Sequence, residues 1–159
     1  KKYKKSNSLK IFTTTTFSKT NRCSEQSEID LYDRYFSSKI CDDESLLVFK
    51  LHPAGGYKIN SHLNNSCNLK YKDRVLFNFT SLNAIPIEMI LYVLINEKIF
   101  DENKIELYAC SSGTAFPKML FNRINIIISF GKKEITRVLK KDFVNGRLTQ
   151  EKILSKKFN

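Results

Sequence analysis

The chain has 159 residues, of which 42% are hydrophobic and 27% charged, and its formal net charge is +11. This composition is typical of a globular protein with room for one domain and its core. No apolar run approaches the roughly 20 residues of a membrane-spanning helix, and no apolar stretch follows the basic start, so we expect neither a transmembrane segment nor a signal peptide.

The positive charge is carried mostly by lysines that are spread along the whole chain. No recognition-helix or RNP-like pattern accompanies them, so we do not expect a nucleic-acid partner. Their short clusters are interpreted as solvated faces of the molecule. The alternative is a positive field that attracts an anionic sugar nucleotide or an acidic membrane surface.

The four cysteines and two histidines form no recognisable metal-binding pattern. The cysteines lie far apart without a C-x-x-C pair, and the histidines do not complete an obvious zinc site with them. This spacing indicates reduced thiols in a cytoplasmic protein, with no metal ion bound.

The first half of the chain alternates between predicted strands and helices. It starts with a basic leader over residues 1–8. Ser24 or Ser27 is a suitable cap for the first helix, whose apolar residues recur with helical spacing. The predicted elements are, in order, a strand at 9–16, a helix at about 28–40, a buried strand at 46–51, a turn at 53–56 and a polar loop with some helix at 57–73.

The second half continues the same alternation. Ser81 or Asn83 is a suitable cap for a buried helix that reaches Asn96, with Pro86 in its first turn. The predicted elements are, in order, a strand at 74–79, that helix, a strand at 104–110, a short helix after Gly113, a strand at 124–130, a helix at about 133–143, a turn at 145–146 and a short closing helix.

Strands that alternate with helices at this spacing predict an α/β fold, a Rossmann-like parallel sheet with helices on both faces. Ligands of such sheets bind beyond the carboxyl ends of the strands. The residues in those positions are Thr13 to Phe17, His52 with Pro53, and Ser111 with Ser112.

His52 lies between an apolar strand and the turn that begins at Pro53. Lys50 is two residues earlier and therefore on the same face of the strand. Together they form a compact site for an anion, and a histidine with a near-neutral pKa also protonates a leaving phosphate oxygen. The alternative is a histidine buried in the core beside a surface lysine.

Glu88 is surrounded by apolar residues in the helix that is predicted to be buried. A buried carboxylate is unfavourable unless it is paired or hydrogen-bonded, although the first turn of a helix favours negative charge. One interpretation is that Glu88 accepts hydrogen bonds from ribose hydroxyls. The other is that it only caps its own helix.

Ser111-Ser112-Gly113-Thr114 lies where a strand is followed by a helix. Backbone N–H groups and two hydroxyls at such a junction are able to bind a phosphate, although the P-loop pattern is absent. The alternative is a helix N-cap made by one serine.

The candidate site residues lie within four segments: Phe12-Thr-Thr-Thr-Thr-Phe17, Phe49-Lys-Leu-His-Pro-Ala-Gly-Gly56, Ile85-Pro-Ile-Glu-Met-Ile90 and Ala109-Cys-Ser-Ser112. In order and spacing they resemble the bacterial sialyltransferases of glycosyltransferase family 80. The resemblance covers nearly all of the chain, and the K-x-H-P-x-G-G element is its most specific part.

The resemblance implies a GT-B architecture in which residues 9–159 are the C-terminal domain that binds CMP-sialic acid. His52 is implied to be the general acid at the departing CMP phosphate. The resemblance also implies a transfer that needs no metal or other cofactor, because protein donors neutralise the leaving group. The residues implied to hold the donor are Lys50 beside the cytidine, Pro53, Glu88 at the ribose hydroxyls, and Ser111 and Ser112 at the phosphate.

Two departures from the family pattern matter. Phe17 stands where the family usually has a tryptophan near the acceptor, so the acceptor or the linkage is expected to differ. The family's catalytic aspartate belongs to an N-terminal acceptor domain, which we expect to be absent from this chain. We therefore expect donor binding with little turnover, unless a longer or separate polypeptide supplies that domain.

The expected activity is transfer of sialic acid to a galactoside-type glycan in bacterial lipooligosaccharide biosynthesis. Two alternatives stay open: a non-catalytic, truncated remnant that binds nucleotide, and another GT-B transferase such as a polysialyltransferase. The expected location is the cytoplasm, and peripheral contact with the inner membrane stays open.

Overall fold

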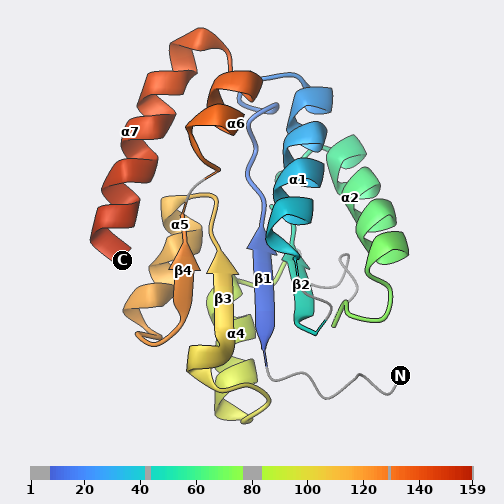
Figure 1. The fold of residues 1–159 in the computed structure, drawn as a ribbon, viewed down its shortest axis with the longest axis vertical. Coiled ribbons are helices and arrows are strands. Elements are labelled where there is room, and N and C mark those ends of the chain that lie inside the picture. Colours follow the sequence, from blue (N-terminus) through green and yellow to red (C-terminus); the bar gives the residue numbers. More distant parts are fainter. Residues whose placement is uncertain (1–7, 42–43, 77–83, 129, 159) are drawn as a thin grey trace.

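The computed structural model describes residues 8–41, 44–76, 84–128 and 130–158. Within them, four parallel strands form a sheet in the order β2-β1-β3-β4 (Figure 1). The strands are β1 (Leu9–Thr13), β2 (Leu46–Lys50), β3 (Ile105–Tyr108) and β4 (Asn125–Ile127). The helices are α1 (Glu25–Lys39), α2 (Tyr57–Lys70), α4 (Ile87–Asn96), α5 (Ser112–Ala115), α6 (Lys132–Val138) and α7 (Lys141–Phe158), with short 3-10 helices η1 (Glu102–Lys104) and η2 (Phe116–Met119).

Alternate side chains of each strand pack into two cores on opposite faces of the sheet. Phe12 and Tyr108 stack at 4.4 Å between ring centroids in the core that contains the buried residues of α1, α2 and α6. Ile11 and Leu107 lie in the other core, with those of α4, α5 and α7. The predicted Rossmann-like α/β sheet with helices on both faces is therefore confirmed.

The sheet register brings three strand ends to one edge. Thr13 of β1 is paired with Lys50 of β2, and Phe12 is paired with Tyr108 of β3. Because all three strands are parallel, the residues that follow them leave the sheet at the same edge. The segments after β1, β2 and β3 are those that the sequence singled out.

Helix α2 covers most of the segment that was predicted to be a polar loop with some helix. Its many asparagines and serines are weak helix formers. However, Ile59, Leu63 and Cys67 are spaced four residues apart and are all buried in the core that also contains α1. Packing of this narrow apolar stripe outweighs the low helix propensity of the residues around it.

The predicted turn at residues 145–146 is wrong. The helical segment is interrupted earlier, between Val138 and Lys141, and Gly146 lies inside the continuous helix α7. Arg147, Leu154 and Phe158 form a buried stripe along that helix, which holds it together through the glycine.

Helix α4 was predicted to be buried nearly all round, and this is also wrong. Met89, Tyr92 and Val93 are 59%, 61% and 49% exposed, so only one face of the helix reaches the core. The residue that caps the helix is Pro86, which was expected in its first turn. The predicted caps Ser81 and Asn83 lie outside the described residues.

The strand predicted at 74–79 is described only at its start. Val75 forms a parallel bridge with Leu47 of β2, and residues 77–79 lie outside the described residues. Among the helices that the structure describes, none combines the length and the apolar character needed to cross a bilayer.

Candidate functional site

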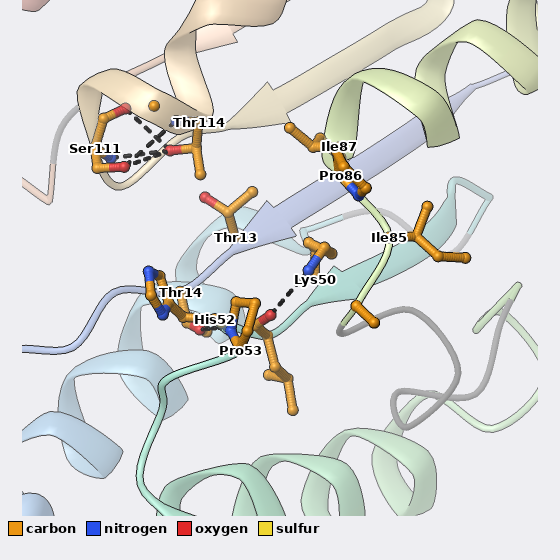
Figure 2. Close-up of a pocket in the computed structure, with 13 residues that line it drawn as sticks. Thr13, Thr14, Lys50, His52, Pro53, Ile85, Pro86, Ile87, Ser111 and Thr114 are labelled. Carbon is orange, nitrogen blue, oxygen red and sulfur yellow. Dashed lines mark hydrogen bonds between the residues drawn. The ribbon is translucent and has the colours of Figure 1, made fainter.

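A cavity of about 280 Å³ lies at the carboxyl edge of the sheet (Figure 2). Its wall is made by residues from the ends of three strands and from the start of α4. The lining residues are Thr13 and Thr14 at the end of β1, Lys50 to Pro53 at the end of β2, Ala84 to Ile87 before and at the start of α4, and Ser111, Gly113 and Thr114 after β3. Lys50, His52, Pro53 and Ser111, which the sequence predicted as site residues, are thus brought together.

His52 is held on one side by two backbone hydrogen bonds. Its own N–H donates to the Thr14 hydroxyl at 2.8 Å, and the N–H of Ala54 donates to its Nδ1 atom at 3.1 Å. Since Nδ1 accepts a hydrogen bond, the neutral ring carries its proton on Nε2. The ring therefore presents a fixed donor when it is neutral.

Several effects act on the pKa of His52. Burial lowers it from the ordinary value of 6.5, the positive charge of Lys50 lowers it further, and Glu28 opposes both. Protonation also converts Nδ1 from an acceptor into a donor, which removes the bond from Ala54. An anion bound in the cavity acts in the opposite direction, because it favours the charged ring.

Lys50 lies at the end of β2 and is only 7% exposed. Its Nζ atom donates to the carbonyl of Leu51 at 3.2 Å. Burial lowers the pKa of Lys50, and the nearby negative charge of Glu88 opposes this shift. The lysine thus brings a largely desolvated cation to the lining of the cavity.

Glu88 lies in the first turn of α4, is partly exposed and is not among the residues that line the cavity. It acts on the cavity through its charge, by opposing the shift of Lys50. The expectation of a fully buried glutamate at this position is wrong, because this side of α4 faces outward.

Ser111 lines the cavity and also caps helix α5. Its Oγ accepts a hydrogen bond from the Thr114 N–H at 3.4 Å, and the Thr114 hydroxyl accepts one from the Ser111 N–H at 3.0 Å. The capping role that was the alternative interpretation is therefore present. Ser112 is exposed and lies outside the lining.

Phe17 is 1% exposed and lies in the core, not in the cavity wall. Its ring packs against Phe130 at 6.0 Å between centroids, and the guanidinium of Arg147 lies 5.3 Å from its centre. This buried position does not support a contact between Phe17 and an acceptor.

Sequence reasoning missed Glu28, a carboxylate that is fully buried. Its Oε1 accepts hydrogen bonds from the Phe17 N–H at 3.1 Å and the Tyr32 hydroxyl at 3.0 Å, and its Oε2 accepts one from the Ser18 N–H at 2.7 Å. Glu28 thereby fixes the loop that follows β1. The available signal was its place in the first turn of α1, four residues before Tyr32 on the apolar face.

The cavity is suited to an anion. A lysine and a histidine line it, and no aspartate or glutamate is among its described lining residues. Within the described part of the chain, no group of three or more histidine, cysteine or acidic side chains is arranged to hold a metal ion. Comparisons with protein-family models, curated proteins and solved structures found no match to this chain.

Proposed function

We propose that the cavity binds CMP-sialic acid and that the chain is the donor-binding part of a bacterial sialyltransferase of the GT-B type. The observation that carries the proposal is that Lys50, His52 and Ser111 line one cavity, although the first two lie at the end of β2 and the third follows β3. The segments that contain them are also those that resemble the sialyltransferases of glycosyltransferase family 80.

The size of the cavity supports a nucleotide rather than a whole sugar nucleotide. At about 280 Å³ it lies just below the range of about 300–1,000 Å³ that is usual for ligand pockets. In the proposed complex the CMP moiety fills it, with its phosphate between His52 and Ser111. The sialic acid then extends outward, toward the domain that binds the acceptor.

In the proposed reaction the bond between the anomeric carbon of sialic acid and the CMP phosphate oxygen breaks. The electron pair stays on the phosphate, where His52 donates a proton or hydrogen bond and Lys50 supplies positive charge. An acceptor hydroxyl oxygen forms the new bond to the anomeric carbon. Its proton passes to a base on the acceptor domain.

Calorimetric titration with CMP and with CMP-sialic acid tests the proposal. We expect CMP to bind. We expect His52→Ala to weaken this binding by about tenfold or more, because the variant loses a hydrogen bond to a charged group. His62→Ala is the matched control, because His62 pairs with Asp33 at 2.9 Å and lines a different cavity. If the folded protein binds neither ligand at millimolar concentration, the proposal is wrong.

A panel of nucleotides separates this function from that of another GT-B transferase. Protection from thermal unfolding by CMP, and not by uridine or purine nucleotides, supports the cytidine assignment. The proposal further assigns the chain to the cytoplasm and a lipooligosaccharide galactoside as the acceptor. Transfer to such a glycan is expected only when an acceptor domain is supplied.

A further inference from the structure

Thr13 is the last residue of β1 and Thr14 follows it, and both line the cavity. The hydroxyl oxygen of Thr14 accepts a hydrogen bond from the N–H of His52 at 2.8 Å. The hydroxyl oxygen of Thr13 accepts one from the N–H of Cys110 at 3.1 Å. The Thr14 hydroxyl is therefore bonded to the segment that follows β2, and the Thr13 hydroxyl to the segment that follows β3.

The two hydroxyls differ in the use of their own hydrogen. Thr13 donates its hydrogen to the carbonyl of Tyr108 at 3.0 Å, so its hydroxyl both donates and accepts within the protein. Thr14 makes no such donation to any residue that the structure describes. A hydroxyl has one hydrogen to donate, and a buried donor without an acceptor is unfavourable.

Thr14 is 3% exposed and lines the cavity. Figure 2 shows Thr14 beside His52, at the same side of the cavity. The bond that the Thr14 oxygen accepts from His52 polarises its O–H group and makes it a better donor. The geometry therefore provides a buried donor next to the imidazole, with no protein acceptor among the described residues.

We propose that the Thr14 hydroxyl donates a hydrogen bond to a phosphate oxygen of the bound ligand, while its oxygen holds the backbone of His52 beside the same phosphate. This inference rests on the proposed function, in which the ligand is a cytidine nucleotide. It adds a residue that contacts the phosphate directly and positions the general acid.

Binding of CMP and of cytidine to variants of the protein tests this role, because the two ligands differ only in the phosphate. Thr14→Val keeps the shape of the side chain and removes the hydroxyl; we expect it to weaken CMP binding about tenfold or more and cytidine binding less than about twofold. Thr14→Ser keeps the hydroxyl and is expected to stay within about threefold of the original chain. Thr16→Val is the control, since Thr16 belongs to the same threonine run but does not line the cavity.

Each outcome decides the inference. Equal weakening of CMP and cytidine by Thr14→Val would show a structural role only, and unchanged CMP binding would remove the role altogether; either result leaves the proposed function standing. If the original chain binds neither ligand, the proposed function fails and this inference fails with it.

NMR on the unsubstituted chain keeps the test independent of how well Thr14→Val folds. Donation by the Thr14 hydroxyl makes its oxygen a better acceptor for the His52 N–H. The His52 amide proton is therefore expected to move downfield when CMP is added, and not when cytidine is added. An identical response to both ligands overturns the inference.

Discussion

Two sets of polar side chains lie close to the carboxyl end of β1, and they differ in how far protein groups satisfy their hydrogen-bonding capacity. The carboxylate of Glu28 accepts three hydrogen bonds from protein groups and is fully buried. In the cavity, by contrast, the Thr14 hydrogen and the His52 Nε2 atom have no partner among the described residues.

This difference separates residues that hold the fold from residues that serve a ligand. A buried polar group whose bonding capacity is filled by the protein stabilises the folded chain. A group that lines a cavity with unused bonding capacity gains its partner from a ligand. The same substitution is therefore expected to change stability at one group and binding at the other.

The largest expected effect on stability is that of Glu28→Ala. It leaves the N–H groups of Phe17 and Ser18 without their acceptor, and also the Tyr32 hydroxyl. We expect the free energy of unfolding to fall by about 4 kcal/mol in urea titrations. Glu88→Ala, at a partly exposed position, is the matched control and is expected to change it by less than about 0.5 kcal/mol. If both substitutions lowered the free energy of unfolding equally, Glu28 would not differ from Glu88 in its contribution to stability.

A loss of about 3 kcal/mol is expected for Glu151→Leu, because it leaves the buried charge of Arg147 uncompensated. The Arg147 Nε atom donates to Glu151 at 2.9 Å, and its Nη1 atom donates to the Cys110 carbonyl at 2.8 Å. The double variant Arg147→Met/Glu151→Leu should recover part of the loss, since it removes both charges. A double variant less stable than Glu151→Leu alone would contradict this account.

The fold was predictable because its signals are local and periodic. The apolar runs at residues 46–51 and 104–110 match β2 and β3, and Ser24 caps α1 as one of the two predicted candidates. The errors arose where packing outweighs local preference. Gly146 is a turn residue by composition, but the buried stripe of α7 carries the helix through it.

The candidate site was predictable only in part. The rule that ligands bind at the carboxyl edge of a parallel sheet located Lys50, His52 and Ser111. The outward direction of Glu88 depends on how α4 is rotated on the sheet, which the run of apolar residues around it does not reveal. The role of Glu28 depends on a contact with the loop after β1, which its place in the first turn of α1 does not reveal by itself.

Gly146→Ala changes α7 at a position that belongs neither to the Glu28 hydrogen-bond group nor to the cavity. Space is open around this glycine, since an added Cβ atom would meet nothing within 4 Å. Alanine is the better helix former by about 0.5–1 kcal/mol, so we expect the free energy of unfolding to rise by that amount. Unchanged CMP binding in the same variant shows that stability and binding vary separately. A decrease in stability would contradict a continuous α7.

The smallest expected effect is a pH dependence of stability that comes from His52. Its pKa in the folded chain lies below the ordinary value of 6.5, because of burial first and then Lys50. Between these two pKa values the unfolded chain binds more protons than the folded chain, so the unfolding free energy decreases as the pH falls through this window. Thermal or urea unfolding between about pH 7 and pH 5 should show this decrease in the original chain and a smaller one in His52→Gln. If the unfolding free energies of the original chain and of His52→Gln changed equally with pH, the folded chain would accommodate the charged imidazole as easily as water does. The cavity would then lack the desolvation that distinguishes a ligand-binding histidine from one at the surface.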